Sequence, residues 1–191
     1  MRDLGVTQAL APQVPEPIFP LLIVLTALGG PKLVAIASTG GSILAVKTGW
    51  IDPARAGRFL VAVALTLSVS VLLKTGLAMG RPPEGLMAIP EDSYGFPSGH
   101  ATASAGLSTA LVGISNRRDY WVYALAVAFV LLIGTTRLLL GVHYLVDVLA
   151  GIGVGVLVAS AALYAFRIRP RITLGTTTAV VAVALPVWAL F

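Results

Sequence analysis

Apolar runs about as long as a membrane is thick recur along this chain, and they limit it to one class of fold. A hydrocarbon layer about 30 Å thick needs roughly 20 helical residues to cross it, and irregular backbone cannot face lipid. Charged residues make up 11% of the sequence and hydrophobic residues 57%, which exceeds the usual share in a soluble domain. The sequence therefore predicts an all-α integral membrane protein.

The apolar runs divide into a bundle of about six transmembrane helices. The run over residues 18–46 is interrupted by Gly29-Gly30-Pro31, which should break or kink a helix. We expect a short interfacial or re-entrant helix before this break and a membrane span after it. The six predicted spans are Pro31–Val46, Gly57–Gly76, Gly99–Ser115, Tyr120–Thr136, Val146–Phe166 and Ile172–Leu190.

We expect residues 1–17 to form an N-terminal tail and residues 18–191 to form a single transmembrane domain. The stretch from Pro12 to Pro20 is rich in proline, and no linker, low-complexity tract or repeat divides the remainder. The residues after Arg2 and Asp3 differ from the apolar core of a secretory signal, so we expect no cleavage there. The chain has no cysteine, which excludes disulfides, thiol nucleophiles and thiolate metal sites.

Basic residues are shared unevenly between the two sides of the predicted bundle. Alternate loops lie on the same side of the membrane, and cytoplasmic loops carry an excess of Lys and Arg. One side receives Lys47, Arg55, Arg58, Arg117, Arg118, Arg167, Arg169 and Arg171. Orientation in the cell membrane thus explains the net charge of +5, and the spread of the arginines argues against binding of nucleic acid. The opposite side should face away from the cytoplasm.

Three polar clusters lie on this non-cytoplasmic side. They consist of Lys74 with Arg81, of Pro97-Ser98-Gly99-His100, and of Arg137 with His143 and Asp147. Ionisable groups at a membrane edge are costly and usually functional. Singly, each basic residue is as readily a membrane anchor, but together the clusters supply cations, imidazoles, a hydroxyl and a carboxylate. This set suits a phosphoryl group, whose transition-state charge is stabilised by a preset array of cations and donors.

The segment Pro97-Ser98-Gly99-His100 has the properties of an anion-binding helix start. Ser98 suits the N-cap position, and Gly99 permits close approach of the backbone. The unpaired amides and the positive dipole end of such a helix attract an anion. An ordinary capped helix would have the same tetrapeptide, so this segment predicts a site only together with the other two clusters.

The spacing of His143 and Asp147 favours a reactive imidazole. Residues four apart on a helix share a face, so the carboxylate can accept a hydrogen bond from the ring and fix its tautomer. The other ring nitrogen is then a competent nucleophile toward phosphorus. Gly151 and Gly155 continue the same stripe and permit close helix packing. The reactive face should therefore point into the bundle.

Taken together, the clusters resemble the signature of the type 2 phosphatidic acid phosphatase superfamily, whose fold is shared with vanadium-dependent haloperoxidases. That signature runs Lys-x6-Arg-Pro, then Pro-Ser-Gly-His, then Ser-Arg-x5-His-x3-Asp. This chain matches it with Lys74 and Arg81-Pro82, with residues 97–100, and with Thr136-Arg137, His143 and Asp147. One position departs from the pattern, because Thr136 replaces the usual serine while keeping a hydroxyl.

The resemblance implies a membrane-bound phosphatase with His143 as the nucleophile that forms a phosphohistidine. It further implies that Asp147 orients His143, and that His100 protonates the leaving oxygen and then activates water. The implied phosphate-binding residues are Lys74, Arg81, Ser98, Gly99 and Arg137. No cofactor and no metal is implied, and we interpret Glu84, Glu91 and Asp92 as solvated surface charges. The expected partners are membrane lipids and a substrate that is a lipid phosphate or a polyprenyl diphosphate.

Two other functions fit the same residues. A lipid phosphotransferase would pass the phosphoryl group from the same intermediate to an alcohol, and a lipid-phosphate transporter would bind the group without breaking a bond. A transporter does not require an oriented His–Asp pair, and no inverted repeat is apparent. A haloperoxidase fits less well, because its known representatives are soluble. Among phosphatidate, phosphatidylglycerol phosphate, polyprenyl diphosphates and small phosphorylated metabolites, the shape of the pocket decides.

Overall fold

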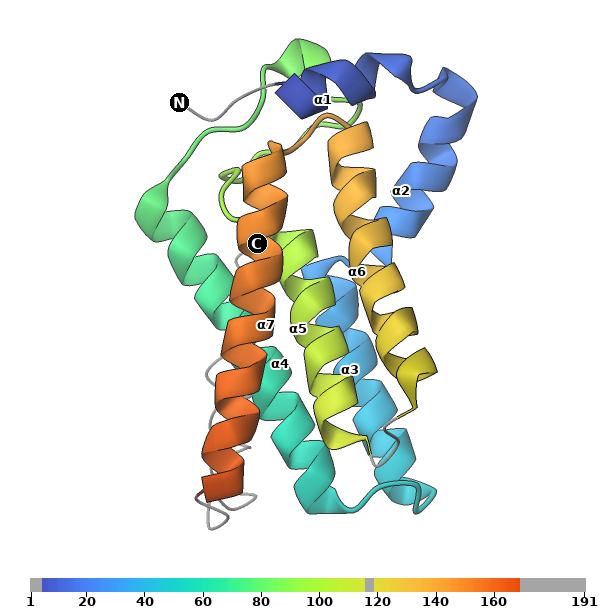
Figure 1. The fold of residues 1–191 in the computed structure, drawn as a ribbon, viewed down its shortest axis with the longest axis vertical. Coiled ribbons are helices and arrows are strands. Elements are labelled where there is room, and N and C mark those ends of the chain that lie inside the picture. The colour runs from blue at the N-terminus through green and yellow to red at the C-terminus, as the bar shows by residue number, and fades with distance from the viewer. Residues whose placement is uncertain (1–4, 116–118, 169–191) are drawn as a thin grey trace.

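The fold is all-helical, as the apolar runs predict. The computed structural model describes residues 5–115 and 119–168, and within these ranges it contains helices and no strands. The α-helices are α1 (Gly5–Leu10), α2 (Phe19–Ala27), α3 (Pro31–Lys47), α4 (Pro53–Leu77), α5 (Gly99–Ile114), α6 (Tyr120–Leu139) and α7 (Leu145–Ile168). Figure 1 shows α3 to α7 running along the long axis of the molecule, with α1 lying across one end.

Three of the described helices, α4, α6 and α7, are long and apolar enough to cross a membrane. The helical pair over residues 5–13 and 16–27 passes the same test as one unit bent by 96°, which would make a fourth. Helices α3 and α5 have 17 and 16 residues and complete the bundle. The chain is therefore a multi-pass membrane protein. The sixth predicted span, Ile172–Leu190, falls outside the described residues.

The N-terminal segment breaks where glycine and proline predict it. Helix α2 ends at Ala27 and α3 begins at Pro31, so the interruption coincides with Gly29-Gly30. A Cβ atom on Gly29 would lie 2.9 Å from Cγ1 of Ile133, so glycine lets this break pack directly against α6. A short helix before the break and a longer helix after it thus match the expected arrangement, although α3, with 17 residues, is shorter than the helices that qualify as membrane spans.

Part of the expected N-terminal tail is folded onto the bundle. Residues 5–10 form α1, which packs near the end of α6. The side chain of Thr7 is fully buried, and its hydroxyl donates a hydrogen bond to the carbonyl oxygen of His143 at 2.8 Å. The helix α1 is too short to contain a long apolar run, and its position depends on contacts with residues distant in the sequence.

Close packing between α5 and α7 sets the centre of the bundle. A Cβ atom on Gly151 would lie 2.7 Å from the carbonyl oxygen of Ser98, and one on Gly155 would lie 2.8 Å from Cβ of Ala105. These two glycines therefore permit the close contact that their spacing predicts. The amide of Ser98 also donates to the carbonyl oxygen of Asp147 at 2.9 Å, which fixes the start of α5 beside the first turn of α7.

The directions of the helices place the basic residues of the predicted cytoplasmic side and the three signature clusters at opposite ends of the bundle. Helix α3 ends, α4 begins and α7 ends at one end of the bundle (Figure 1). These helix ends contain Lys47, Arg55, Arg58 and Arg167. Helices α4 and α6 end, and α5 and α7 begin, toward the other end. The three signature clusters therefore lie on the side opposite these basic residues. Arg117, Arg118, Arg169 and Arg171 fall outside the described residues.

Candidate active site

The three signature clusters surround one cavity of about 420 Å³. Its polar lining includes Lys74, Arg81, Gly99, His100 and His143, which come from α4, the following loop, α5 and the α6–α7 connection. Its apolar wall comes from α2, α3 and α4 and includes Ala27, Leu33, Leu67 and Val71. The cavity thus combines a cationic surface with an apolar one.

His143 is held between a carboxylate and a guanidinium. Its Nδ1 lies 3.4 Å from Oδ2 of Asp147, and its Nε2 lies 3.2 Å from Nη1 of Arg81. A guanidinium only donates hydrogen bonds, so Nε2 must accept and Nδ1 must carry the ring proton. This is the tautomer in which the Nε2 lone pair can react.

His143 and Asp147 do not share a helix as their spacing suggested. Helix α7 begins at Leu145, so Asp147 lies in its first turn and His143 lies in the preceding connection. The Asp147 carboxylate accepts a hydrogen bond from the backbone amide of Tyr144 at 3.0 Å, and this turns the chain back so that the ring of His143 is also within reach. The pair forms by helix capping, and both side chains are buried.

The surroundings of His143 favour its neutral ring. Burial lowers the pKa of this imidazole well below its usual value of about 6.5, and the cations Arg137, Arg81 and Lys74 lower it further because they oppose a second positive charge. The neutral imidazole is the form that can attack phosphorus. Burial and neighbouring charge therefore act together to keep the proposed nucleophile available.

The first residues of α5 line the candidate active site. Ser98 has the extended backbone of an N-cap residue, and its hydroxyl accepts from the amide of Ala101 at 3.5 Å. A Cβ atom on Gly99 would lie 3.3 Å from Cε of Lys74, so the glycine lets the lysine reach across the helix start. His100 lies next to the α2–α3 break, because a Cβ atom on Gly30 would be 3.6 Å from its Nε2.

Residues 91–94 of the α4–α5 loop contact all three signature cations. The carboxylate of Glu91 pairs with Nη2 of Arg81 at 3.0 Å through Oε2 and with Nη2 of Arg137 through Oε1. Arg81 also donates to the carbonyl oxygen of Ser93 at 2.7 Å and to its hydroxyl at 2.9 Å, and Lys74 donates to the carbonyl oxygen of Tyr94. The interpretation of Glu91 as a solvated surface charge is therefore wrong, since its side chain is 20% exposed and bridges two arginines.

Two threonines join the site from the N-terminal segment. Thr7 binds the backbone of His143, and Thr26 of α2 accepts a hydrogen bond from Nη1 of Arg137 at 3.2 Å. The arginine is 1% exposed, so this contact replaces water that the guanidinium has lost. No spacing links these threonines to the signature, and a single sequence carries no signal that would have found them.

The departure at Thr136 does not alter the cavity lining. Its hydroxyl donates to the carbonyl oxygen of Ile133 at 2.7 Å, within its own helix, and the side chain is buried. Serine can make the same bond from this position. The hydroxyl supports the end of α6 that carries Arg137.

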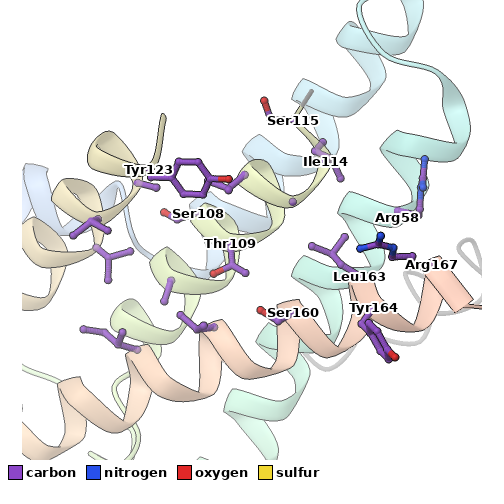
Figure 2. Close-up of a pocket in the computed structure, with 18 of the residues that line it drawn as sticks. Arg58, Ser108, Thr109, Ile114, Ser115, Tyr123, Ser160, Leu163, Tyr164 and Arg167 are labelled. Atoms are coloured by element: carbon purple, nitrogen blue, oxygen red, sulfur yellow. The ribbon is translucent and has the colours of Figure 1, made fainter. Parts of the chain in front are cut away.

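A second, larger cavity of about 870 Å³ lies between α5, α6 and α7 toward the opposite end of the bundle. Figure 2 shows Arg58 and Arg167 at one end of this cavity, with Tyr123 reaching in from α6. Among the described residues that line it there is no histidine, aspartate or glutamate. It offers no pairing of a nucleophile with an acid, so we place the candidate active site in the smaller cavity.

Comparison with known proteins identifies the family. Residues 55–171 match the PAP2 superfamily, and because they are more than half of the chain, this chain belongs to that superfamily. Phosphatidylglycerophosphatase B of Bacillus subtilis (strain 168) is 30% identical over 82 residues, which are 39% of this chain and 40% of that protein. The match thus spans less than half of that relative.

Two solved structures share the fold. The first is a transmembrane PAP2-type phosphatidylglycerolphosphate phosphatase from Bacillus subtilis, with a TM-score of 0.71 and 21% identity, covering 88% of this chain and 86% of that one. The second is LpxE from Aquifex aeolicus, with a TM-score of 0.69 and 18% identity, covering 85% of this chain and 94% of that one. The signature resemblance and the expected membrane bundle are both confirmed.

Proposed function

We propose that this chain is a membrane-bound phosphatase that hydrolyses a lipid phosphate or a polyprenyl diphosphate through a phosphohistidine at His143. One observation carries the proposal: the reactive nitrogen of His143, oriented by Asp147, lies within 3.2 Å of an arginine in a cavity lined by further cations. A lone basic residue could serve as an anchor, but a buried nucleophile beside three cations is what phosphoryl transfer requires.

In the first step, Nε2 of His143 attacks phosphorus, an N–P bond forms, and the bond from phosphorus to the leaving oxygen breaks. His100 takes up a proton from the solvent when the negatively charged phosphoryl group binds beside it, and it gives this proton to that oxygen. Lys74, Arg81 and Arg137 then stabilise the negative charge of the equatorial oxygens, with the hydroxyl of Ser98 and the amide of Gly99 as further donors. In the second step, neutral His100 takes a proton from water, the oxygen attacks phosphorus, and the N–P bond breaks to release phosphate.

We propose that the reaction needs no metal ion. Lys74 of α4, Arg81 of the following loop and Arg137 of α6 would together supply the positive charge that a divalent ion would otherwise provide. Phosphate release should therefore continue in the presence of a chelator. Strict dependence on magnesium would contradict this part of the mechanism.

The apolar wall supports a lipid substrate. Leu33, Leu67 and Val71 line the cavity beside the cationic groups and belong to membrane helices, so an acyl or prenyl chain could lie against them while its phosphate meets the cations. The Bacillus subtilis relative is by name a phosphatidylglycerophosphatase, which supports the same substrate class. We place the active site on the non-cytoplasmic face, because the basic residues of the opposite end favour the cytoplasm.

The deciding experiment compares wild-type protein with a His143→Asn variant in mixed micelles. Both are assayed with chelator on phosphatidate, phosphatidylglycerol phosphate and a polyprenyl diphosphate, and Tyr123→Phe in the second cavity serves as the control. We expect wild-type and control to release phosphate from at least one lipid, and His143→Asn to lose both turnover and the acid-labile phosphoenzyme. Normal activity of His143→Asn would exclude this residue as the nucleophile.

The same preparation separates the alternatives. In the presence of an added alcohol, a phosphotransferase would form mainly the phosphorylated alcohol rather than free phosphate, because its intermediate reacts with the alcohol in preference to water. Binding and exchange of lipid phosphates by wild-type protein without phosphate release would favour a transporter.

A further inference from the structure

The loop between α4 and α5 occupies the position that the proposed mechanism reserves for a phosphoryl group. Glu91 lies on the wall of the same cavity as His100 and His143. Its two carboxylate oxygens pair with two different arginines, Arg81 and Arg137, both of which are signature residues. Two oxygens of one phosphoryl group would use the same donors.

The carboxylate fills this position incompletely. The Nε atom of Arg137 is buried and has no hydrogen-bond partner among the described residues. Buried guanidinium donors are normally satisfied, because leaving one unpaired is costly. A carboxylate offers two oxygens, whereas a tetrahedral phosphoryl group offers three, and the third could reach this remaining donor. Glu91 therefore resembles a bound anion that is smaller than the one the site is built for.

The loop is anchored on both sides of Glu91 without involving its carboxylate. The amide of Ala88 donates to the carbonyl oxygen of Leu140 at 2.9 Å, and the amide of Gly95 donates to that of Met79 at 2.7 Å. Ser93 and Tyr94 are held by Arg81 and Lys74 through their backbone oxygens. The Glu91 side chain can therefore leave the arginines while the loop stays in place.

We infer that Glu91 is an internal competitor of the substrate: its carboxylate occupies the phosphate position between Arg81 and Arg137 until a doubly charged phosphoryl group displaces it. This inference rests on the proposed function. Such a competitor lowers the apparent affinity of every anion by the same factor. A phosphodiester brings one negative charge and a phosphate monoester brings two, so the diester binds the arginines more weakly. The diester headgroups that surround a membrane enzyme are therefore the ligands that Glu91 keeps out most completely.

The test measures binding of two anions to wild-type protein and to a Glu91→Gln variant. The probes are orthovanadate, whose five-coordinate form imitates the transferring phosphoryl group, and short-chain phosphatidylglycerol, a phosphodiester lipid. Affinity is followed by inhibition of turnover and by the anion-dependent rise in melting temperature. Asp92→Asn is the matched control, since Asp92 is the next residue, is exposed, and loses the same charge.

We expect Glu91→Gln to bind orthovanadate about tenfold more tightly, the factor for a wild-type site open in roughly a tenth of molecules. Inhibition by phosphatidylglycerol should increase by a similar factor, because the same carboxylate closes the wild-type site to both anions, and Asp92→Asn should bind both anions as wild type does. If Glu91 only orders the two arginines, Glu91→Gln will instead bind orthovanadate more weakly, and the inference is overturned. That result leaves the proposed function intact as long as His143→Asn still abolishes the phosphoenzyme.

A Glu91→Ala variant provides a second test of whether the Glu91 carboxylate competes with the substrate. Removal of the side chain leaves space for an added carboxylate, so acetate should compete with orthovanadate in this variant and have no such effect in wild-type protein. Equal effects of acetate on the two proteins would contradict the inference, whatever the stability of Glu91→Gln.

Discussion

At His143, two neighbours decide which ring nitrogen carries the proton. Arg81 can only donate, so it requires a lone pair on Nε2, and Asp147 accepts the proton on Nδ1. Both contacts favour the same tautomer, and burial favours the same neutral charge state. Burial and the neighbouring cations therefore keep the Nε2 lone pair free of a proton, as the proposed attack on phosphorus requires.

This environment predicts the protonation of His143. Burial and the three cations disfavour the imidazolium, so the ring should stay neutral as the pH falls through 6.5 and should take up a proton only in more acidic solution. Since the unfolded chain would be protonated near pH 6.5, the folded state should lose stability as the pH falls below that value.

The measurement uses the fact that the chain has two histidines. In a His100→Gln variant with isotope-labelled histidine, the single ring signal reports His143, and we expect its NMR titration midpoint below pH 6.5. Replacing Arg81 by methionine in that variant removes one cation and should move the midpoint upward. A midpoint at or above pH 6.5 in the first variant would show that the ring is not shielded as the structure indicates.

The residues of the site differ in how far the sequence predicts them. His143 and Asp147 are predictable because a local spacing brings them together, although the contact forms through a cap rather than a helix face. Glu91 is not predictable, because it meets Arg81 across 10 residues and Arg137 across 46, and no period connects them. Thr7 is still more remote, at 136 residues from its partner.

Among the helices, α1 acts on the site through one hydrogen bond. The Thr7 hydroxyl donates to the carbonyl oxygen of His143, and the threonine is fully buried. In a Thr7→Val variant this carbonyl would lose its side-chain donor, and we expect a loss of about 1 kcal/mol in stability together with a lower kcat. Thr7→Ser keeps the hydroxyl and should restore kcat. Equal kcat values for the two variants would show that α1 does not position His143.

The close contact between α5 and α7 predicts that both stability and kcat depend on Gly151. A Cβ atom on Gly151 would meet the carbonyl oxygen of Ser98 at 2.7 Å, so Gly151→Ala should push the start of α5 away from α7. We expect a loss of about 1–3 kcal/mol in stability and a marked fall in kcat, because His100 and His143 lie on the two sides of this contact. The melting temperature and the rate of phosphate release measure the two effects.

Gly153 provides the control for this substitution. It lies on the same helix, and a Cβ atom there would meet nothing within 4 Å. Gly153→Ala should leave kcat unchanged and should not lower the melting temperature, since alanine favours the helix. Equal losses in the two alanine variants would mean that helix propensity, and not the contact with Ser98, governs the result.

Helix boundaries follow the sequence where proline, glycine or serine marks them. Pro31 and Gly99 begin α3 and α5 as predicted, and α6 begins at the predicted Tyr120. Helix α4 starts four residues before the predicted Gly57, because the carboxylate of Asp52 caps it by accepting from the amide of Arg55 at 2.8 Å. Helix α1 escapes prediction because its position depends on packing against α6 rather than on its own residues.

Over the whole molecule, the signature clusters and the basic residues that favour the cytoplasm lie at opposite ends of the bundle. Odd and even connections alternate between the ends, so the order of the helices alone separates Lys47, Arg55 and Arg167 from the signature clusters. The apolar surface between the ends includes exposed leucines such as Leu125, Leu131 and Leu157, as a lipid-facing exterior requires. The same separation predicts which side of the membrane supplies the substrate.

The absence of cysteine makes this orientation directly measurable. Glu84 lies in the loop at the site end and Thr48 follows α3 at the opposite end, and both are exposed, so each can be replaced by a single cysteine. We expect a membrane-impermeant maleimide to label Glu84→Cys in intact spheroplasts and to label Thr48→Cys only after the membrane is opened. The reverse pattern would place the site in the cytoplasm. The substrate would then come from the inner leaflet. The proposed reaction at His143 would be unaffected, because it depends on local geometry, whereas the orientation depends on basic residues at the opposite end of the bundle.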